Sequence, residues 1–382
     1  MAALEVRAGS RAAHRWLLVV VGVVLAAGLF ALPLVVRSAA QIGTLSQLVA
    51  YSVAILGLIL LMGYCGQISI GHGAFVGIGA YTTVILVADA GWPYLATVPV
   101  AVLVCMVAGL VIGIPALRIQ GLYLVTVTLS VAALFPVLVT QFEELTGGAN
   151  GKVARRPMAV PEWFFLEERS RAAAPTLAFY VIVLIAALAF WLARNLVRSR
   201  IGRAMIAIRN APISAAAAGV PVARIKVWVF SISAGYAGLA GALLAIQLPT
   251  ATESRFGLDL SIFLLVAAIV GGSRSIWGAL TGAVVLVVIR TWIADWAQEA
   301  DLLAGRPDGG QIVGILAAAL LLLAVFVLPT GLIAGLRAIG RRRPTATSAS
   351  ACRTTSTTST TTAASTASRS PSTSRTTSTS PT

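Results

Sequence analysis

The chain contains 382 residues, of which 58% are hydrophobic and only 11% carry a charge, and its formal net charge is +15. Soluble domains carry roughly 25% charged residues on average, and a single core at this length cannot bury so much apolar surface. These values exclude a soluble globular protein and predict an integral membrane protein.

Stretches without Asp, Glu, Lys or Arg indicate where the membrane helices are expected. The longest lies between Arg37 and Asp89. A bilayer core about 30 Å thick is crossed by about 20 apolar helical residues, so this stretch is long enough for two spans. We expect ten spans in chain order, at residues 16–36, 45–62, 68–88, 94–117, 120–141, 175–193, 227–248, 259–273, 276–293 and 311–329. The fold class that follows is all-α, a polytopic transmembrane bundle of about ten helices.

Two parts of this assignment have alternatives. Three arginines precede the first apolar run, as they do in a secretory signal, but the run is long and further spans follow, so we expect an uncleaved first helix. Arg274 separates the eighth and ninth spans, which are short and interrupted by glycines. Such segments can be broken helices, which are tolerated where protein or a cavity covers the freed backbone.

The basic residues predict how the chain is oriented and divided. With ten spans, both termini share a side with the connection 194–226, and most of the Lys and Arg fall there, whereas of the 13 acids only Glu5 does. Because short cytoplasmic loops are rich in Lys and Arg, we place this side on the cytoplasmic face of the plasma membrane. We expect a cytoplasmic N-terminus at 1–15, a membrane domain at 16–336 with an outer loop at 142–175, and a basic cytoplasmic tail at 337–382.

Other uses of the charge and polar residues are disfavoured. The basic residues are spread over loops instead of gathered on one soluble domain, so we expect no nucleic-acid partner. The Ser/Thr-rich tail lacks apolar periodicity, which predicts disorder. Two histidines and three unpaired cysteines supply neither a metal site nor a Ser-His-Asp set, so we expect no enzyme activity in this chain.

A glycine-rich run, GYCGQISIGHGAFVGIGAY, interrupts the long uncharged stretch at residues 63–81. Its glycines weaken a continuous helix, and its polar side chains need partners at membrane depth. We therefore consider five residues as candidates for a solute pathway: Gly66, Gln67, Ser69, His72 and Gly73. The alternative is close helix packing through small residues, and we favour a packed, hydrogen-bonded imidazole over a proton relay.

The run LTGGANGK, from Leu145 to Lys152, superficially resembles a phosphate-binding loop. Thr146 stands where the first glycine is required, and Val153 follows the lysine where Ser or Thr is required. We interpret the run as a turn-rich outer loop. If transport is driven by ATP, the nucleotide and its Mg²⁺ therefore bind to another polypeptide, and this chain carries no cofactor.

The connection RSRIGRAMIAIRNAPISAAAAGVPVARIK, at residues 198–226, contains signals for a short helix. Asn210 can cap it, Pro212 suits its first turn, and Gly219 suits its exit. A helix at this position would lie across the cytoplasmic face and dock into a groove on a partner. An ordinary basic loop would explain the charges but not the pattern of cap, helix and glycine.

These segments together resemble the LivM-type permease subunits of branched-chain amino acid ABC importers. The resemblance is carried by the two glycine-containing runs, by the 198–226 segment, and by GLYLVTVTL from Gly121 and VGGSRSIWGALTGA from Val270, all in the expected order. It implies a second homologous permease subunit, two cytoplasmic ATPase subunits and an extracytoplasmic substrate-binding protein. It further implies a helix at 210–220 that couples to an ATPase, through Arg209, Asn210, Pro212, Ala216, Ala218 and Gly219.

The chain departs from the family at this helix. Family members carry acidic residues before the glycine, whereas this chain carries alanines, so contacts through those acids are not transferred. Two rival functions stay open. A urea or short-amide permease has a similar glycine-rich run, although Gln67 favours the amino-acid branch. An ion-coupled secondary transporter requires an ionisable residue at mid-membrane, which the clearest spans lack.

Overall fold

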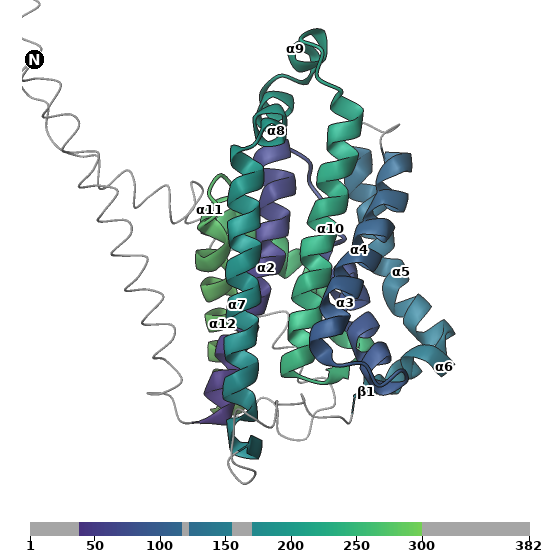
Figure 1. Ribbon diagram of the computed structural model, residues 1–382, viewed down its shortest axis with the longest axis vertical. Helices are drawn as coiled ribbons and strands as arrows, with labels where there is room; N and C mark the ends of the chain where they lie inside the picture. Colours follow the sequence, from purple (N-terminus) through teal and green to yellow (C-terminus); the bar gives the residue numbers. More distant parts are fainter. Residues whose placement is uncertain (1–37, 117–121, 155–169, 300–382) are drawn as a thin grey trace, which may run out of the picture. The chain divides into compact units, whose positions relative to one another are not determined.

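The computed structural model describes residues 38–116, 122–154 and 170–299. Helices make up nearly all of these ranges, which confirms the all-α class (Figure 1). The long helices are α2 (Ala39–Leu58), continued by the π-helical turn η1 (Ile59–Tyr64), α3 (His72–Ala88), α4 (Tyr94–Ala116), α5 (Leu122–Gln141), α7 (Ser170–Arg198), α10 (Val222–Gln247), α11 (Leu258–Gly272) and α12 (Gly278–Glu299). The short elements are α6 (Glu143–Thr146), η2 (Gly148–Asn150), β1 (Lys152–Val153), α8 (Arg200–Asn210), α9 (Pro212–Ala217), β2 (Thr250–Ala251) and η4 (Glu253–Arg255).

Six helices in these ranges are long and apolar enough to cross a membrane, and two shorter apolar helices accompany them. The six cover Ala40–Tyr64, Tyr94–Ile114, Leu124–Gln141, Pro175–Arg198, Val222–Gln247 and Glu253–Gly272, and the shorter two cover His72–Ala88 and Gly278–Ile289. Each of the eight corresponds to an expected span. The expected spans at 16–36 and 311–329, the N-terminus at 1–15 and the tail at 337–382 lie outside the described residues, so the total of ten stays a prediction.

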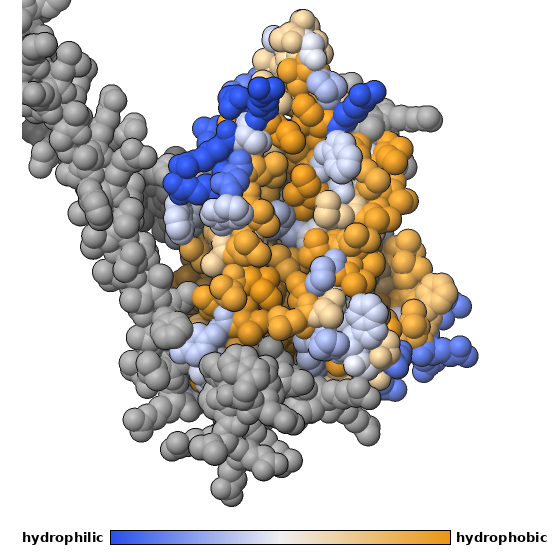
Figure 2. Space-filling view, viewed as in Figure 1, coloured by the Kyte–Doolittle hydropathy of each residue, from blue (hydrophilic) through white to orange (hydrophobic). Residues whose placement is uncertain are grey.

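Two helices form the centre of the bundle. α10 packs against α4, α3 and α2, and α2 packs in turn against α7 and α12. Within the 18-residue apolar stretch of α10, 83% is buried, whereas only 28% is buried in the corresponding stretch of α4. The outer helices instead expose large aliphatic side chains such as Leu103, Val111 and Leu184. Figure 2 shows hydrophobic residues across the middle of this face, which is the surface expected of helices in lipid.

Small residues let α3 and α10 approach each other closely, as the packing interpretation of the glycine-rich run predicted. A methyl group on Gly79 of α3 would overlap the backbone of Gly238 in α10. One on Gly241 would overlap the backbone of Val76, on the next turn of the same pair. In the absence of a hydrophobic driving force between helices in lipid, such backbone contact supplies the van der Waals packing that holds the pair together.

The described bundle has two polar ends. α8 and α9 lie at one end, and α6 and β1 at the other (Figure 1); we call them the α8–α9 end and the α6 end. Hydrophilic residues gather at both (Figure 2). At the α6 end, β1 pairs with β2 in an antiparallel ladder, with Lys152 opposite Ala251. The basic connection 194–226 and the LTGGANGK run therefore lie at opposite ends of the bundle, as the alternation of spans requires.

Candidate functional site

The glycine-rich run breaks a helix, and the break corrects one expected boundary. α2 widens into η1 at Ile59, and regular helix ends by Cys65. Gly66 then has φ +76°, a left-handed conformation that glycine adopts without the penalty of a Cβ. The chain stays non-helical until α3 begins at His72, so the third span starts there and not at residue 68.

The non-helical segment runs back into the bundle beside α10. Gln67 Nε2 donates a hydrogen bond to the carbonyl of Lys226, near the start of α10, over 3.2 Å. His72 meets Ser233 of the same helix over 2.8 Å. Since an α-helix rises 1.5 Å per residue, these two contacts lie roughly 10 Å apart along α10. The segment 66–71 thus carries the start of α3 into the interior of the protein.

A chain of hydrogen bonds surrounds His72, which is 1% exposed. The hydroxyl of Ser233 donates to the carbonyl of Gly57 over 2.6 Å, so its oxygen accepts from His72 Nε2–H. His72 Nδ1 then accepts from the hydroxyl of Ser69 over 3.3 Å. This assigns a neutral imidazole whose two ring nitrogens both have partners. The geometry is that of the packed, hydrogen-bonded histidine that we favoured.

Hydroxyl groups from three other helices meet the start of α3. A helix start leaves backbone N–H groups without intrahelical partners, and burial makes them costly. Here Ile70 N–H donates to Thr128 Oγ1 of α5 over 3.1 Å, and Gly73 N–H donates to Ser261 Oγ of α11 over 2.9 Å. With Ser233 of α10, these residues complete a polar cluster that the sequence analysis missed. The signal for it was the presence of Ser and Thr within otherwise apolar stretches.

The five pathway candidates do not form one group. Gln67, Ser69, His72 and Gly73 are buried along the re-entrant segment, whereas Gly66 is exposed at the α8–α9 end. A cavity of about 250 Å³ lies elsewhere, toward the α6 end. It is lined by residues of α2, α3, α10, η4 and α12, among them Gln47, Tyr51, Leu244, Arg255 and Phe256, and by none of the five candidates. Their role in a pathway stays a prediction.

The connection after α7 forms two short helices. α8 buries Gly202, Met205 and Ile208 and exposes Arg200 and Arg203. α9 buries only Ala215, and its Ile213 is 85% exposed. α9 thus stands clear of the bundle (Figure 1), and the apolar side chain of Ile213 is uncovered.

The expected helix cap at Asn210 is wrong. Asn210 is the last residue of α8, and Ala211 occupies the N-cap position of α9 without a side-chain hydrogen bond. The reason is Pro212: a residue before proline is excluded from the helical region, so the chain leaves the helix at Ala211, which has φ −153° and ψ 84°. Pro212 begins α9 as expected, and Gly219 ends its turn with φ +82°.

Arg209 does not share the exposure of its neighbours. Its guanidinium donates a hydrogen bond to the carbonyl of Gly63, at the end of η1. Burial, and then the charge of Arg274, lower the pKa of Arg209. Tyr64 Oη donates to the carbonyl of Arg274 over 3.5 Å, so the turn between α11 and α12 lies against the same end of η1. The sequence placed Arg209 in the connection but did not indicate this contact.

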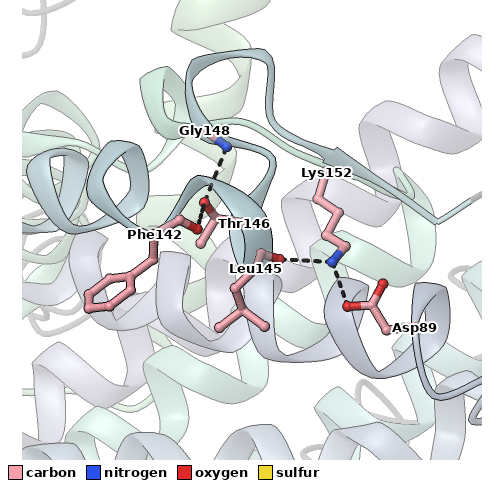
Figure 3. Close-up of polar contacts among 6 residues, drawn as sticks. All are labelled: Asp89, Phe142, Leu145, Thr146, Gly148 and Lys152. Atoms are coloured by element: carbon pink, nitrogen blue, oxygen red, sulfur yellow. Dashed lines mark hydrogen bonds and ion pairs between the residues drawn. The ribbon is translucent and has the colours of Figure 1, made fainter.

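The LTGGANGK run closes the α6 end of the bundle. Lys152 Nζ forms an ion pair with Asp89 over 2.5 Å and donates to the carbonyl of Leu145 over 2.8 Å (Figure 3). Thr146 Oγ1 donates to the carbonyl of Phe142 and accepts from Gly148 N–H, over 2.8 and 3.2 Å. Lys152 thus ties the loop to α3, which agrees with a structural turn and not with a phosphate-binding loop. Among the described side chains, no group of three or more His, Cys, Asp or Glu could hold a metal ion.

A known protein family matches most of this chain. Residues 41–328 match the family described as the branched-chain amino acid transport system / permease component. This match contains the broken helix, the hydroxyl cluster and the α8–α9 connection. The chain belongs to the branched-chain amino acid transport permease family.

Curated members of the permease family align with most of this chain. The high-affinity branched-chain amino acid transport system permease protein LivM of Escherichia coli K12 is 31% identical over 292 residues, which cover 71% of this permease and 67% of that one. LivM of Salmonella typhimurium is 30% identical over 288 residues, with the same coverage. The permease protein LivH of Escherichia coli K12 is 27% identical over 292 residues, covering 74% of this chain and 91% of LivH. No solved structure matches.

Proposed function

We propose that this permease is the membrane-spanning subunit of an ATP-driven importer for leucine, isoleucine and valine. Its relatives LivM and LivH are permease proteins of high-affinity branched-chain amino acid transport systems. Both align with this chain, and both come from Escherichia coli K12, which supports a second homologous permease beside this subunit. By resemblance to the importer family, we also assign two ATPases and an extracytoplasmic binding protein to the assembly.

The observation that carries the proposal is α9, inside the matched region. A six-residue helix with one buried side chain gains little from its own bundle. Isolated short helices are marginal in water, so a partner surface is expected to hold such a helix. The exposed Ile213 and the alanines around it suit helix-in-groove docking, where small residues allow close approach. The ATPase is the partner that we assign to this surface.

Charge at the two ends supports the orientation. The segments that meet at the α8–α9 end, 59–71, 194–226 and 273–277, contain eight Lys and Arg and no Asp or Glu, whereas Asp89, Glu143 and Glu144 lie toward the α6 end. Under the positive-inside tendency, the α8–α9 end faces the cytoplasm and both termini do so too. The α6 end then faces the binding protein, and solute moves from that end to the other between the two permease subunits.

No covalent step is required of this chain. ATP and Mg²⁺ belong to the partner ATPases, and the chain's own residues bind, orient and move. The neutral, fully hydrogen-bonded His72 fits a structural role in such a cycle, because both of its ring nitrogens are already engaged inside the protein.

Reconstituted uptake tests the proposal. The chain is incorporated into liposomes with its candidate partner subunits and ATP, and uptake of labelled leucine, isoleucine, valine, urea and acetamide is compared. ATP-dependent accumulation of the three aliphatic amino acids is expected, with little urea or acetamide. Accumulation of urea instead would assign the chain to the amide branch, and uptake driven by an ion gradient without ATP would refute the importer.

A further inference from the structure

Arg209 connects two parts of the molecule that are far apart in the sequence. It is the second-last residue of α8 and stands three positions before Pro212, where α9 begins. Its guanidinium points back to the bundle and donates to the carbonyl of Gly63, 146 residues away. Arg203, one and a half turns earlier on the same helix, is exposed and contacts only the carbonyl of Arg198. The contact therefore belongs to Arg209 and not to the arginines of α8 in general.

The surroundings of this contact are shaped to receive it. A Cβ on Gly66 would lie 3.1 Å from Cγ of Arg209, so the left-handed glycine leaves room for the stem of the arginine. On the other side, a methyl group on Gly63 would overlap the carbonyl of Ser273, in the turn between α11 and α12. Arg209 thus lies at a junction where α8, η1 and the α11–α12 turn meet.

Among the described residues, Arg209 has no carboxylate in an ion pair with it, and its hydrogen-bond partner is a backbone carbonyl. The last carbonyls of a helix lack intrahelical partners and carry the negative end of its dipole. The only ion pair in the described ranges joins Lys152 to Asp89 at the opposite end of the bundle. Gly63, at the end of the π-helical turn, therefore offers Arg209 a carbonyl in place of a carboxylate. An arginine suits this position because its planar group presents several donors in a fixed geometry.

The link between α9 and the broken helix runs through this contact. On one side of α9, Gly219 has φ +82° and no atom within 4 Å of where its Cβ would be. The turn that leads from α9 into α10 is therefore not packed against other residues at this point. On the other side, only Ala211 separates α9 from the 11-residue helix α8, which is packed through Met205 and Ile208. Displacement of α9 is therefore transmitted more directly to α8, and so to Arg209, than to α10.

We propose that Arg209 is a positioning residue that transmits movement of α9 to the helix break at Gly63–Gly71. This inference rests on the proposed function, because it takes the partner ATPase as the source of the movement. Arg209 holds the carbonyl end of η1. The segment that follows runs from that point down to His72 and its hydroxyl partners. A shift of α8 thereby reorients the re-entrant segment without any direct contact between the ATPase and the membrane interior.

The test uses the reconstituted complex and measures uptake and ATP hydrolysis together. Arg209→Gln keeps an amide donor but removes the charge and the fork, Arg209→Lys keeps the charge, and Arg203→Gln is the matched control on the same helix. We expect Arg209→Gln to lower the number of solutes moved per ATP about tenfold, as loss of one charged hydrogen bond predicts. Arg209→Lys should restore part of this ratio, and Arg203→Gln should equal the wild type.

Gly66→Ala provides a second variant, because it crowds the arginine stem and strains the left-handed turn beside it without changing any charge. It should lower the same ratio even if Arg209→Gln does not assemble. An unchanged ratio in both variants would overturn the inference, and so would a parallel fall of uptake and hydrolysis, which would assign Arg209 to docking alone. Absence of ATP-driven uptake in the wild type would instead refute the proposed function, an outcome distinct from any effect of the variants.

Discussion

Ser233 Oγ accepts a hydrogen bond from His72 Nε2–H and donates one to the carbonyl of Gly57, so that one hydroxyl joins α2, α3 and α10. All three groups are buried at the depth where α3 begins. A serine in the middle of α10 is thus the point through which the broken helix is attached to both central helices.

Ser233→Ala should destabilise the protein more than an ordinary serine substitution. It leaves His72 Nε2–H buried without its acceptor and removes a hydrogen bond to the carbonyl of Gly57, and a buried unsatisfied group costs about 1–3 kcal/mol. Thermal unfolding in detergent should show a clear decrease in Tm. Ser130→Ala is the control, because Ser130 is exposed and donates only to Thr126 of its own helix. Equal Tm values for the two variants would contradict the hydrogen-bond chain.

Gly238→Val should prevent correct packing of α10 against α3 and α4. A Cβ at Gly238 would overlap the side chain of Cys105, and the backbone of Gly79 lies against the same residue. Overpacking of this kind typically costs 1–3 kcal/mol or more. We expect a loss of monodisperse protein in size-exclusion chromatography. Gly113→Ala is the comparison, since its added methyl group would meet Phe230 only at 3.4 Å, and it should behave as the wild type.

Substitution of Gly219 should depend on backbone conformation and not on space. Its φ is +82° and nothing lies within 4 Å, so a side chain meets strain but no clash. Asn adopts the left-handed region far more readily than a β-branched residue does. We expect Gly219→Asn to retain most ATP-driven uptake and Gly219→Val to lose it, with both proteins inserted in the membrane. Comparable uptake in the two variants would remove the turn after α9 from the coupling route.

The ion pair at the α6 end should contribute little and should respond to salt. Asp89 is half exposed, and exposed pairs are worth about 0.2–1 kcal/mol. A double-mutant cycle with Asp89→Asn and Lys152→Gln should give a small coupling energy that shrinks as ionic strength rises. A coupling energy well above that range, unchanged by salt, would mean that this loop is held by more than a surface contact.

Single cysteines should report opposite sides of the membrane for the two ends. In a background without Cys65, Cys105 and Cys352, we expect Ile213→Cys to react with an impermeant thiol reagent only from the cytoplasm. Glu144→Cys should react only from outside. Reaction of both from one side would overturn the proposed orientation, and the same measurement needs no partner subunit.

The sequence predicted the helices well because lipid imposes a simple rule of length and charge. The 16–36 and 311–329 spans aside, each expected span has a helix in the structure. The break after η1 was also visible, since glycines and polar groups interrupt an apolar run. The partners were not visible. A buried hydroxyl must find a hydrogen bond, but nothing local indicates that His72 will find Ser233, 161 residues away, or that Arg209 will find Gly63.

Asn210 shows a second limit on predicting this structure from the sequence. Its side chain is a good helix cap, and the sequence pattern favoured it. Proline two positions later imposed a backbone restriction on Ala211 that outweighed the cap preference. Where a steric exclusion and a hydrogen-bond preference compete at neighbouring positions, the exclusion decides, and the helix boundary moves by one residue.

The backbone contact between α3 and α10 has a consequence for how the protein can change shape. At Gly79–Gly238 and Gly241–Val76, no side chain stands between the two helices. Packed interfaces accommodate motion when side chains switch rotamers or slide past one another, and glycine offers nothing to switch. α3 and α10 should consequently travel as one rigid piece during any conversion between outward- and inward-open forms. The sliding surfaces are then to be sought around this pair and not within it.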